Sequence, residues 1–172
     1  MLMYVPEKRT INGITTGDLL TFGRLSQEND DEESPVIWRV LEIGDNEALL
    51  IKKKAVMRSR YCDRKAIGNP WYIMWGNSLA REMCNGAFFH KAFTEDEKKS
   101  IIPQEIVEAW RGSRCIDEVF LLSEEEVLLL LPEMEQRMAS ATDELERNAA
   151  ASGTENYLLR GDYGVGEGNV FW

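Results

Sequence analysis

The sequence has 172 residues, of which 44% are hydrophobic and 29% are charged, and its formal net charge is −10. This is the composition of an ordinary folded protein, and the length suits one domain, residues 1–172, with a core that needs no disulfide or metal. No apolar run approaches the roughly 20 residues of a membrane helix, and the N-terminus does not resemble a signal peptide. The 3 cysteines are an odd number without a close pair, which argues against a disulfide framework and favours the cytoplasm.

The negative charge is concentrated in the last third of the chain. Residues 1–115 carry 17 acidic and 17 basic side chains, whereas residues 116–172 carry 13 acidic side chains against 3 arginines. An acidic surface repels nucleic acid and anionic membranes, so we expect neither as a partner. A solvated helix face that keeps the protein soluble explains the imbalance most simply.

A strand and a hairpin are expected in the N-terminal part, about residues 17–52. Residues 17–25 alternate weakly between apolar and polar types and predict a strand, and the polar stretch 26–34 has the composition of a loop. Residues 36–43 are rich in β-branched and aromatic types, and a short Gly/Asp/Asn segment joins them to the apolar run 48–51. Two apolar runs with such a connection predict a β-hairpin.

The middle of the chain, residues 76–102, is predicted to be helical. Asn77 or Ser78 can cap a helix whose apolar residues recur every three to four positions. Thr94 and Glu97 have the spacing of a capping box, in which each side chain bonds a backbone N–H of the other residue. The expected inward face consists of Leu79, Ala80, Met83, Cys84, Ala87 and Phe88.

A strand and acidic helices are expected at residues 118–151. Residues 119–122 predict the strand, Ser123 and Glu126 repeat the capping-box pattern, and residues 133–151 predict a helix. A short C-terminal strand at residues 157–159 and a glycine-rich, irregular tail complete the segment 156–172.

Several of these segments, in this order, resemble a bacterial domain of unknown function, family 6273. They are GDLLTFGRLSQEND, IWRVLEI, ALLIKKKAV, DEVFLLSEEEV, YLLRGDYG and, most specifically, WGNSLAREMCNGAFFHKAFTEDEKKSI. The resemblance covers roughly residues 17–164. The residues that match the family's helix pattern are Trp75, Ser78, Arg81, Asn85, Phe88, Ala92 and Phe93.

The resemblance implies an α+β fold of the C-type-lectin-like kind, which is shared with formylglycine-generating enzymes. Such a mixed domain has a twisted antiparallel sheet with helices packed on it. The sequence ends at Trp172, soon after the Leu-Arg segment, so we expect the family's closing strands to be lacking. The relatives that oxidise cysteine use a cysteine pair late in the chain, and no cysteine follows Cys115.

Candidate ligand-binding residues lie near the loop between Tyr61 and Trp75 and near the C-terminal loop. Flat aromatic rings stack on the apolar faces of sugars, and loops carry function more often than regular elements do. Trp38 and Trp75 lie within regular elements and are assigned to the core. The candidates are Tyr61, Trp71, Trp110, Arg160 and Asp162.

Seven basic residues lie close together after the predicted hairpin and form a candidate basic patch. With Tyr61 and Trp71 nearby they resemble a nucleic-acid site, in which cations hold phosphates and aromatic rings stack on bases. A solvated loop that faces the acidic helix is the simpler interpretation. The patch consists of Lys52, Lys53, Lys54, Arg58, Arg60, Arg64 and Lys65.

No catalytic constellation, metal site or cofactor is predicted. His90 is the only histidine, and nothing in the sequence marks a third group that would orient it as a catalytic base. Cys62 lies among basic residues and is the best candidate for a thiolate with a lowered pKa, whereas Cys84 is assigned to the core.

Three functions of different class follow from these observations. The first is a non-catalytic module that binds a ligand or a protein partner. The second is an assembly role, in which the C-terminal third packs against another copy of the chain or a partner. The third is an enzyme whose chemistry the sequence does not reveal. We favour the first, and we expect no enzymatic activity.

Overall fold

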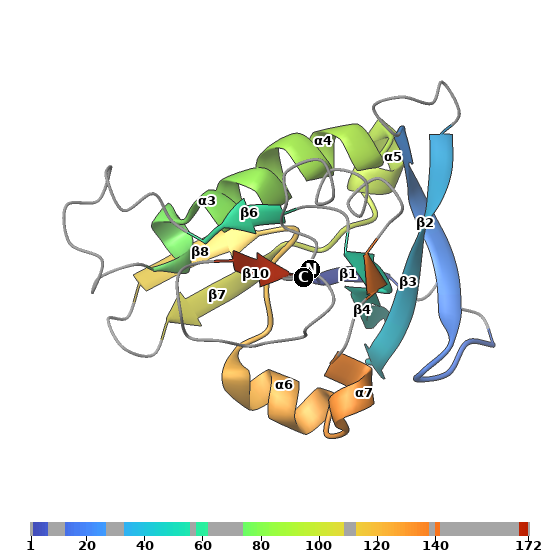
Figure 1. The fold of residues 1–172 in the computed structure, drawn as a ribbon. Helices are drawn as coiled ribbons and strands as arrows, with labels where there is room; N and C mark the ends of the chain where they lie inside the picture. The colour runs from blue at the N-terminus through green and yellow to red at the C-terminus, as the bar shows by residue number, and fades with distance from the viewer. Residues whose placement is uncertain are drawn as a thin grey trace.

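A four-stranded antiparallel sheet, in the order β1-β4-β3-β2, frames the fold (Figure 1). The structure is a computed structural model, and it describes residues 2–6, 13–26, 33–55, 58–61, 74–108, 113–137, 140–141 and 169–171. The strands of this sheet are β1 (Leu2–Pro6), β2 (Leu19–Ser26), β3 (Glu33–Ile43) and β4 (Glu47–Lys52).

The predicted hairpin is confirmed as β3 and β4, closed by a hydrogen bond of 2.8 Å from the Gly44 N–H to the Glu47 carbonyl. Strand β4 lies between β1 and β3, and its consecutive residues Ala48, Leu49 and Leu50 are all buried, so both faces of the strand are covered there. In β3, Val36 and Trp38 are buried while Ile37 between them is exposed, which is the alternation of a strand with one solvent face. The predicted strand at residues 17–25 is confirmed as β2.

One helical segment forms the upper layer in Figure 1, and its C-terminal end lies against the sheet. It consists of a 3₁₀ turn η2 (Trp75–Asn77), α3 (Leu79–Glu82), a π-helical turn η3 (Met83–Phe88) and α4 (Phe89–Ala92). Ser78 is the N-cap, as predicted: its hydroxyl accepts the Arg81 backbone N–H at 3.0 Å. The π turn is visible in the hydrogen bond from the Phe89 N–H to the carbonyl of Cys84, five residues earlier.

The π turn changes the inward face that the sequence predicts. Cys84 and Phe88 are buried as expected, but Ala87 is exposed and Phe89 is buried instead. A π turn adds a residue to the repeat, so the side chains after it are rotated relative to a regular α-helix. Phe89 therefore belongs to the core, where its ring packs against Phe93.

Aromatic rings join this helix to the sheet. Trp38 in β3 is fully buried, and its indole N–H donates to the Phe22 carbonyl at 2.7 Å. Its ring stacks on Phe93 with centroids 6.2 Å apart, and Phe88 packs edge-on against both. Because aromatic side chains bury large areas, these contacts dominate the core between helix and sheet.

A second capped helix, α5 (Glu95–Lys98), is joined to strand β2 by a side-chain hydrogen bond. Thr94 and Glu97 form the predicted capping box, so that prediction is confirmed. The Glu97 carboxylate also accepts the backbone N–H of Gly23 in β2 at 3.2 Å. Hydrogen bonds to the charged form help to keep the pKa of Glu97 below its ordinary value, against the opposing effect of burial.

The remaining elements of the described residues are short. They are β5 (Lys54–Ala55), β6 (Arg58–Arg60), β7 (Gln104–Glu108), β8 (Ser113–Asp117), α6 (Glu124–Leu130), α7 (Met134–Arg137), β9 (Ser140–Ala141) and β10 (Asn169–Phe171). Strands β7 and β8 form an antiparallel hairpin, β6 pairs with β10, and β5 pairs in parallel with β9. The coarse prediction of an α+β fold with antiparallel sheets and helices is confirmed.

Several predictions in the second half of the chain are wrong. The strand expected at residues 119–122 is absent: Val119 and Phe120 are buried as the connection between β8 and α6. Of the helix expected over 133–151, α7 is helical, Ser140 and Ala141 instead pair with β5 as a strand, and residues 138–139 and 142–151 lie outside the described residues. In the tail expected to be irregular, β10 is a strand because it pairs with β6, and the strand expected at 157–159 lies outside the described residues.

Glycine at position 23 is required by both backbone conformation and space, which gives a test of how closely α4 packs on β2. Gly23 has a φ of +78°, and a Cβ there would lie 2.6 Å from the Ala92 carbonyl oxygen. Gly17 has a similar φ of +95° but open space around it. Both alanine variants strain the backbone, by about 1–3 kcal/mol.

We expect Gly23→Ala to lower the free energy of unfolding by at least about 1 kcal/mol more than Gly17→Ala, because only the first forces the helix away from the strand. Urea denaturation of the two variants measures the difference. Equal losses would contradict the close packing of helix and strand.

Candidate functional site

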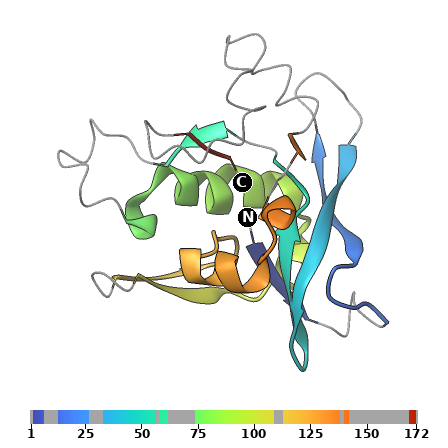
Figure 2. The ribbon, with the colours of Figure 1, turned by 60° about the horizontal axis from the view of Figure 1, so that its bottom comes forward.

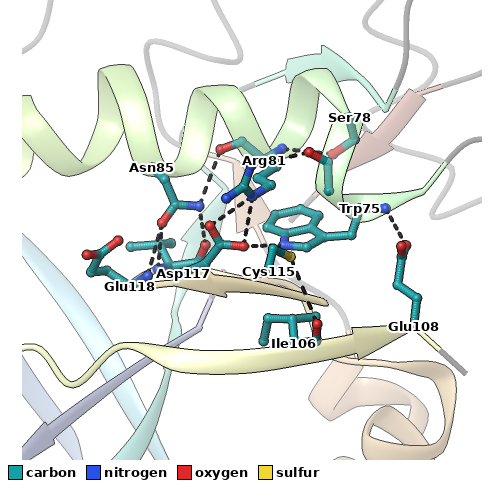
Figure 3. Close-up of polar contacts among 11 residues, drawn as sticks. Trp75, Ser78, Arg81, Asn85, Ile106, Glu108, Cys115, Asp117 and Glu118 are labelled. Carbon is teal, nitrogen blue, oxygen red and sulfur yellow. Dashed lines mark hydrogen bonds and ion pairs between the residues drawn. The ribbon is translucent and has the colours of Figure 1, made fainter. Parts of the chain in front are cut away.

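The most elaborate polar cluster among the described residues surrounds Asp117 at the end of β8 (Figure 3). The residue is only 1% exposed. Its carboxylate accepts the indole N–H of Trp75 at 2.7 Å and the Nε–H of Arg81 at 2.8 and 2.9 Å. The carboxylate thus joins η2 and α3 to the hairpin β7–β8.

Arg81 compensates the buried charge of Asp117. Its side chain is 33% exposed, and its Nη1 donates to the Gly76 carbonyl at 3.2 Å. The hydrogen bond from the guanidinium to Asp117 raises the pKa of Arg81, so the guanidinium stays protonated. A buried carboxylate is stable only when it is paired and hydrogen-bonded in this way.

Asn85 forms hydrogen bonds with the backbone of the residues that follow β8. Its Oδ1 accepts the backbone N–H groups of Glu118 and Val119 at 3.2 and 3.0 Å. Its Nδ2 donates to the carbonyls of Val119 and Arg81 at 2.8 and 3.3 Å. An amide side chain has two donors and two acceptor lone pairs, so all of its capacity is used within the fold.

The inner face of the hairpin adds a second carboxylate and a thiol. Glu108 accepts the backbone N–H of Trp75 through Oε1, while its Oε2 is buried without a hydrogen-bond partner among the described residues. Burial, followed by the hydrogen bond to Asp117, raises the pKa of the Cys115 thiol to about 11. Burial also raises the pKa of Cys84 to about 11. Both thiols are protonated at neutral pH, which is unfavourable for nucleophilic chemistry.

The cluster around Asp117 gives a structural role to polar residues that carry the family resemblance. Trp75, Arg81 and Asn85 bond the hairpin or the chain leaving it, and Ser78 caps the helix. The assignment of Trp38 and Trp75 to the core is confirmed. The described residues contain no group of three or more metal-ligating side chains.

The predicted basic patch is only partly described, and its first residue does not belong to an exposed surface. Lys52 is buried in β4, and its Nζ donates to the Lys54 carbonyl at 2.9 Å. Burial, and secondarily the charge of Lys54, lowers the pKa of Lys52 to about 8. Lys53 and Lys54 are exposed, as a patch requires. The side chains of Arg58 and Arg60, and the whole of Arg64 and Lys65, lie outside the described residues.

The structure describes one of the five candidate ligand-binding residues. Tyr61 is half-buried against the core, and its carbonyl accepts the Leu79 N–H at 2.9 Å. His90 is exposed on α4, next to the ring of Phe89. Cys62 lies outside the described residues. The same holds for four candidates that stay predictions, namely Trp71, Trp110, Arg160 and Asp162.

The sequence analysis missed an exposed apolar surface on α6 and on the hairpin. Leu128 and Leu129 of α6 are 54% and 78% exposed, and Val107 and Ile116 of the hairpin are 51% and 68% exposed. The hairpin lies between α3 and α6 in Figure 1, and α6 lies in front of it when the bottom of the molecule is turned forward in Figure 2. The signal was the run of five apolar residues from Val127, too many for the buried side of a short surface helix.

The sequence profile of a family described as "Domain of unknown function (DUF6273)" matches residues 45–171. The chain belongs to this family. The match begins in the turn between β3 and β4, so the expected resemblance over 17–44 lies outside it. No curated protein and no solved structure matches the chain.

None of the helices in the described part of the chain is long and apolar enough to cross a membrane.

Loss of the Asp117 charge is expected to destabilise the protein strongly. In Asp117→Asn, Arg81 is left without its counter-ion while the variant keeps an acceptor for the Trp75 indole. We expect a loss of about 3 kcal/mol in the free energy of unfolding, at the low end for a broken buried pair because Arg81 is partly exposed. The control is Glu105→Gln, which removes the exposed ion pair with Arg114 and should cost less than about 1 kcal/mol. Urea denaturation measures both losses. If Asp117→Asn lowers the free energy of unfolding no more than the control does, the structural role of Asp117 is contradicted.

Stability should also depend on pH through Lys52. The ordinary pKa of 10.5 applies to the unfolded chain, and the pKa in the folded protein is about 8. Between these values the unfolded state binds more protons, so the contribution of Lys52 to stability rises as the pH rises from 8 to 10.5 and is lost on the way down. The full change is about 3 kcal/mol.

We expect the difference in unfolding free energy between the wild type and Lys52→Met to shift by up to this amount across that window, in favour of the wild type at high pH. The raised pKa values of Cys84 and Cys115 lower stability above about pH 9, but they do so in both proteins and cancel in the difference. A difference that stays flat with pH would show that Lys52 is solvated.

Proposed function

We propose that this member of the family is a non-catalytic protein-interaction module that binds through α6 and the outer face of the hairpin β7–β8. We call this the α6–hairpin surface, and it contains Val107, Ile116, Leu128 and Leu129. The observation that carries the proposal is the exposure of these four large apolar side chains on two neighbouring elements. Single exposed apolar residues are common on soluble proteins, but a group of them is typical of a binding site.

The contacts of the polar side chains support a role without catalysis. Asp117 could act on a substrate if it were free, but it is 1% exposed and bonded to Trp75 and Arg81, and Asn85 uses its whole hydrogen-bonding capacity within the fold. The two described thiols have raised pKa values. A catalytic acid, base or nucleophile must reach a substrate, and these groups are occupied or protonated.

We extend the proposal to the fold and its setting. Residues 1–172 form a single domain with a C-type-lectin-like arrangement, supported by the antiparallel sheet with a helix packed against it. The protein is bacterial and works in the cytoplasm, where free thiols such as those of Cys84 and Cys115 stay reduced.

Thermal unfolding and calorimetry test the proposal together. A panel of nucleotides, sugars, metal ions and short nucleic acids should leave the midpoint of unfolding unchanged. A ligand at a hundred times its Kd would add about 2.7 kcal/mol, which is a shift of several degrees. Such a shift from one small ligand would contradict a protein-interaction role.

A second experiment tests for a protein partner. A protein that binds this chain is captured from a bacterial lysate and purified, and its binding to the chain is measured by calorimetric titration. We expect saturable binding that the double variant Leu128→Gln/Leu129→Gln weakens at least tenfold, which corresponds to about 1.4 kcal/mol. Leu19→Gln removes another exposed leucine, 49% exposed and located on β2, and is the control. Binding that the double variant leaves intact would show that the partner uses another surface.

A further inference from the structure

We infer that the partner segment received by the α6–hairpin surface is an amphipathic helix with lysine or arginine on both sides of its apolar strip. This inference rests on the proposed function and adds the chemistry of the partner. It follows from the charges around the exposed leucines and from the way in which the two elements are arranged.

The exposed leucines of α6 are surrounded by acidic side chains. Glu124, Glu125 and Glu126 form the first turn of α6, and Glu133 and Glu135 follow it; all five are exposed. Glu126 is occupied by the capping box with Ser123, but within the described ranges none of the other four carboxylates forms an ion pair or accepts a hydrogen bond.

The basic residue nearest in sequence bonds to the backbone. Arg137 in α7 donates to the carbonyls of Leu131 and Pro132, the two residues that follow α6, at 2.6 and 2.8 Å. Unpaired carboxylates beside an apolar surface favour a partner with positive charge, because complementary charges speed the encounter and exclude acidic competitors.

The same charges disfavour a second copy of the chain as the occupant. A two-fold symmetric contact uses the same surface on both copies. It would bring the unpaired carboxylates of α6 and of the segment after it from both copies into one interface, where like charges cost several kcal/mol.

A helix suits the arrangement of the two elements better than a strand does. Ile106 and Cys115 on the inner face of the hairpin lie on the side of α3 (Figure 3), so Val107 and Ile116, which alternate with them along the strands, face away from α3. A helix carries apolar side chains at i, i+3, i+4 and i+7 and can contact both elements at once. A strand added to the hairpin edge would be held by backbone bonds and would leave Leu128 and Leu129 uncovered.

Three synthetic peptides test the inference. All share one leucine strip on a helical frame, and their flanking positions are all lysine, all glutamine or all glutamate. We expect fluorescence anisotropy to give affinities in the order lysine, glutamine, glutamate, with at least a tenfold gap between the first and the last. The affinity of the lysine peptide should fall as salt rises, because exposed charges are screened.

Two double variants separate the roles of charge and apolar contact. Leu128→Gln/Leu129→Gln should abolish binding of the lysine peptide, whereas Glu124→Gln/Glu125→Gln should weaken the lysine peptide severalfold and leave the glutamine peptide unchanged. Glu33→Gln/Glu42→Gln removes two exposed carboxylates from β3 and is the matched control for charge.

Equal affinity for the three peptides, or binding of none, would overturn the inference. If none binds while the captured protein still binds through Leu128 and Leu129, the inference fails and the proposed function stands; if neither binds there, both fail. Sedimentation at two protein concentrations adds one more outcome. A dimer that Leu128→Gln/Leu129→Gln abolishes would identify a second copy as the occupant and overturn the inference.

Discussion

The buried carboxylate of Asp117 is the contact on which the rest of the arrangement depends. It is where the helical segment, the hairpin β7–β8 and the chain that leads to α6 meet, through Trp75, Arg81 and the neighbouring Asn85. A charge this deeply buried is tolerated only with its partners in place, so it ties these elements to one geometry. The position of α6, and with it the proposed binding surface, follows from that geometry.

The polar cluster and the aromatic contacts occupy different parts of the same helical segment. Before the π turn, Trp75 and Arg81 bond the hairpin; Phe88 at the end of the turn and Phe93 beyond it pack on Trp38 in the sheet. Asn85 lies within the π turn and uses all four of its hydrogen bonds. The helix is therefore a bridge between sheet and hairpin, and the residues that carry the family resemblance mark this bridge more than they mark a site for chemistry.

Local signals predicted part of this fold well. The hairpin β3–β4 and the capping boxes at Thr94 and Ser123 depend on neighbouring residues, so the sequence reveals them. The hairpin β7–β8 was missed because its pattern is inverted: Glu108 and Asp117 face inward, while Val107 and Ile116 face solvent. Only the distant Trp75 and Arg81 make those inward carboxylates stable. The π turn and the strand at Ser140 likewise depend on tertiary contacts that no local pattern records.

The measurement that tests the central claim most directly is amide hydrogen exchange of the full chain, with and without a saturating partner protein. The account predicts slower exchange on binding in residues 104–117 and 124–130, while the helical segment 75–92 is unchanged. Slower exchange confined to residues 61–74 and to the C-terminal loop would contradict it. That result would return the function to the loops around Tyr61, Trp71 and Arg160.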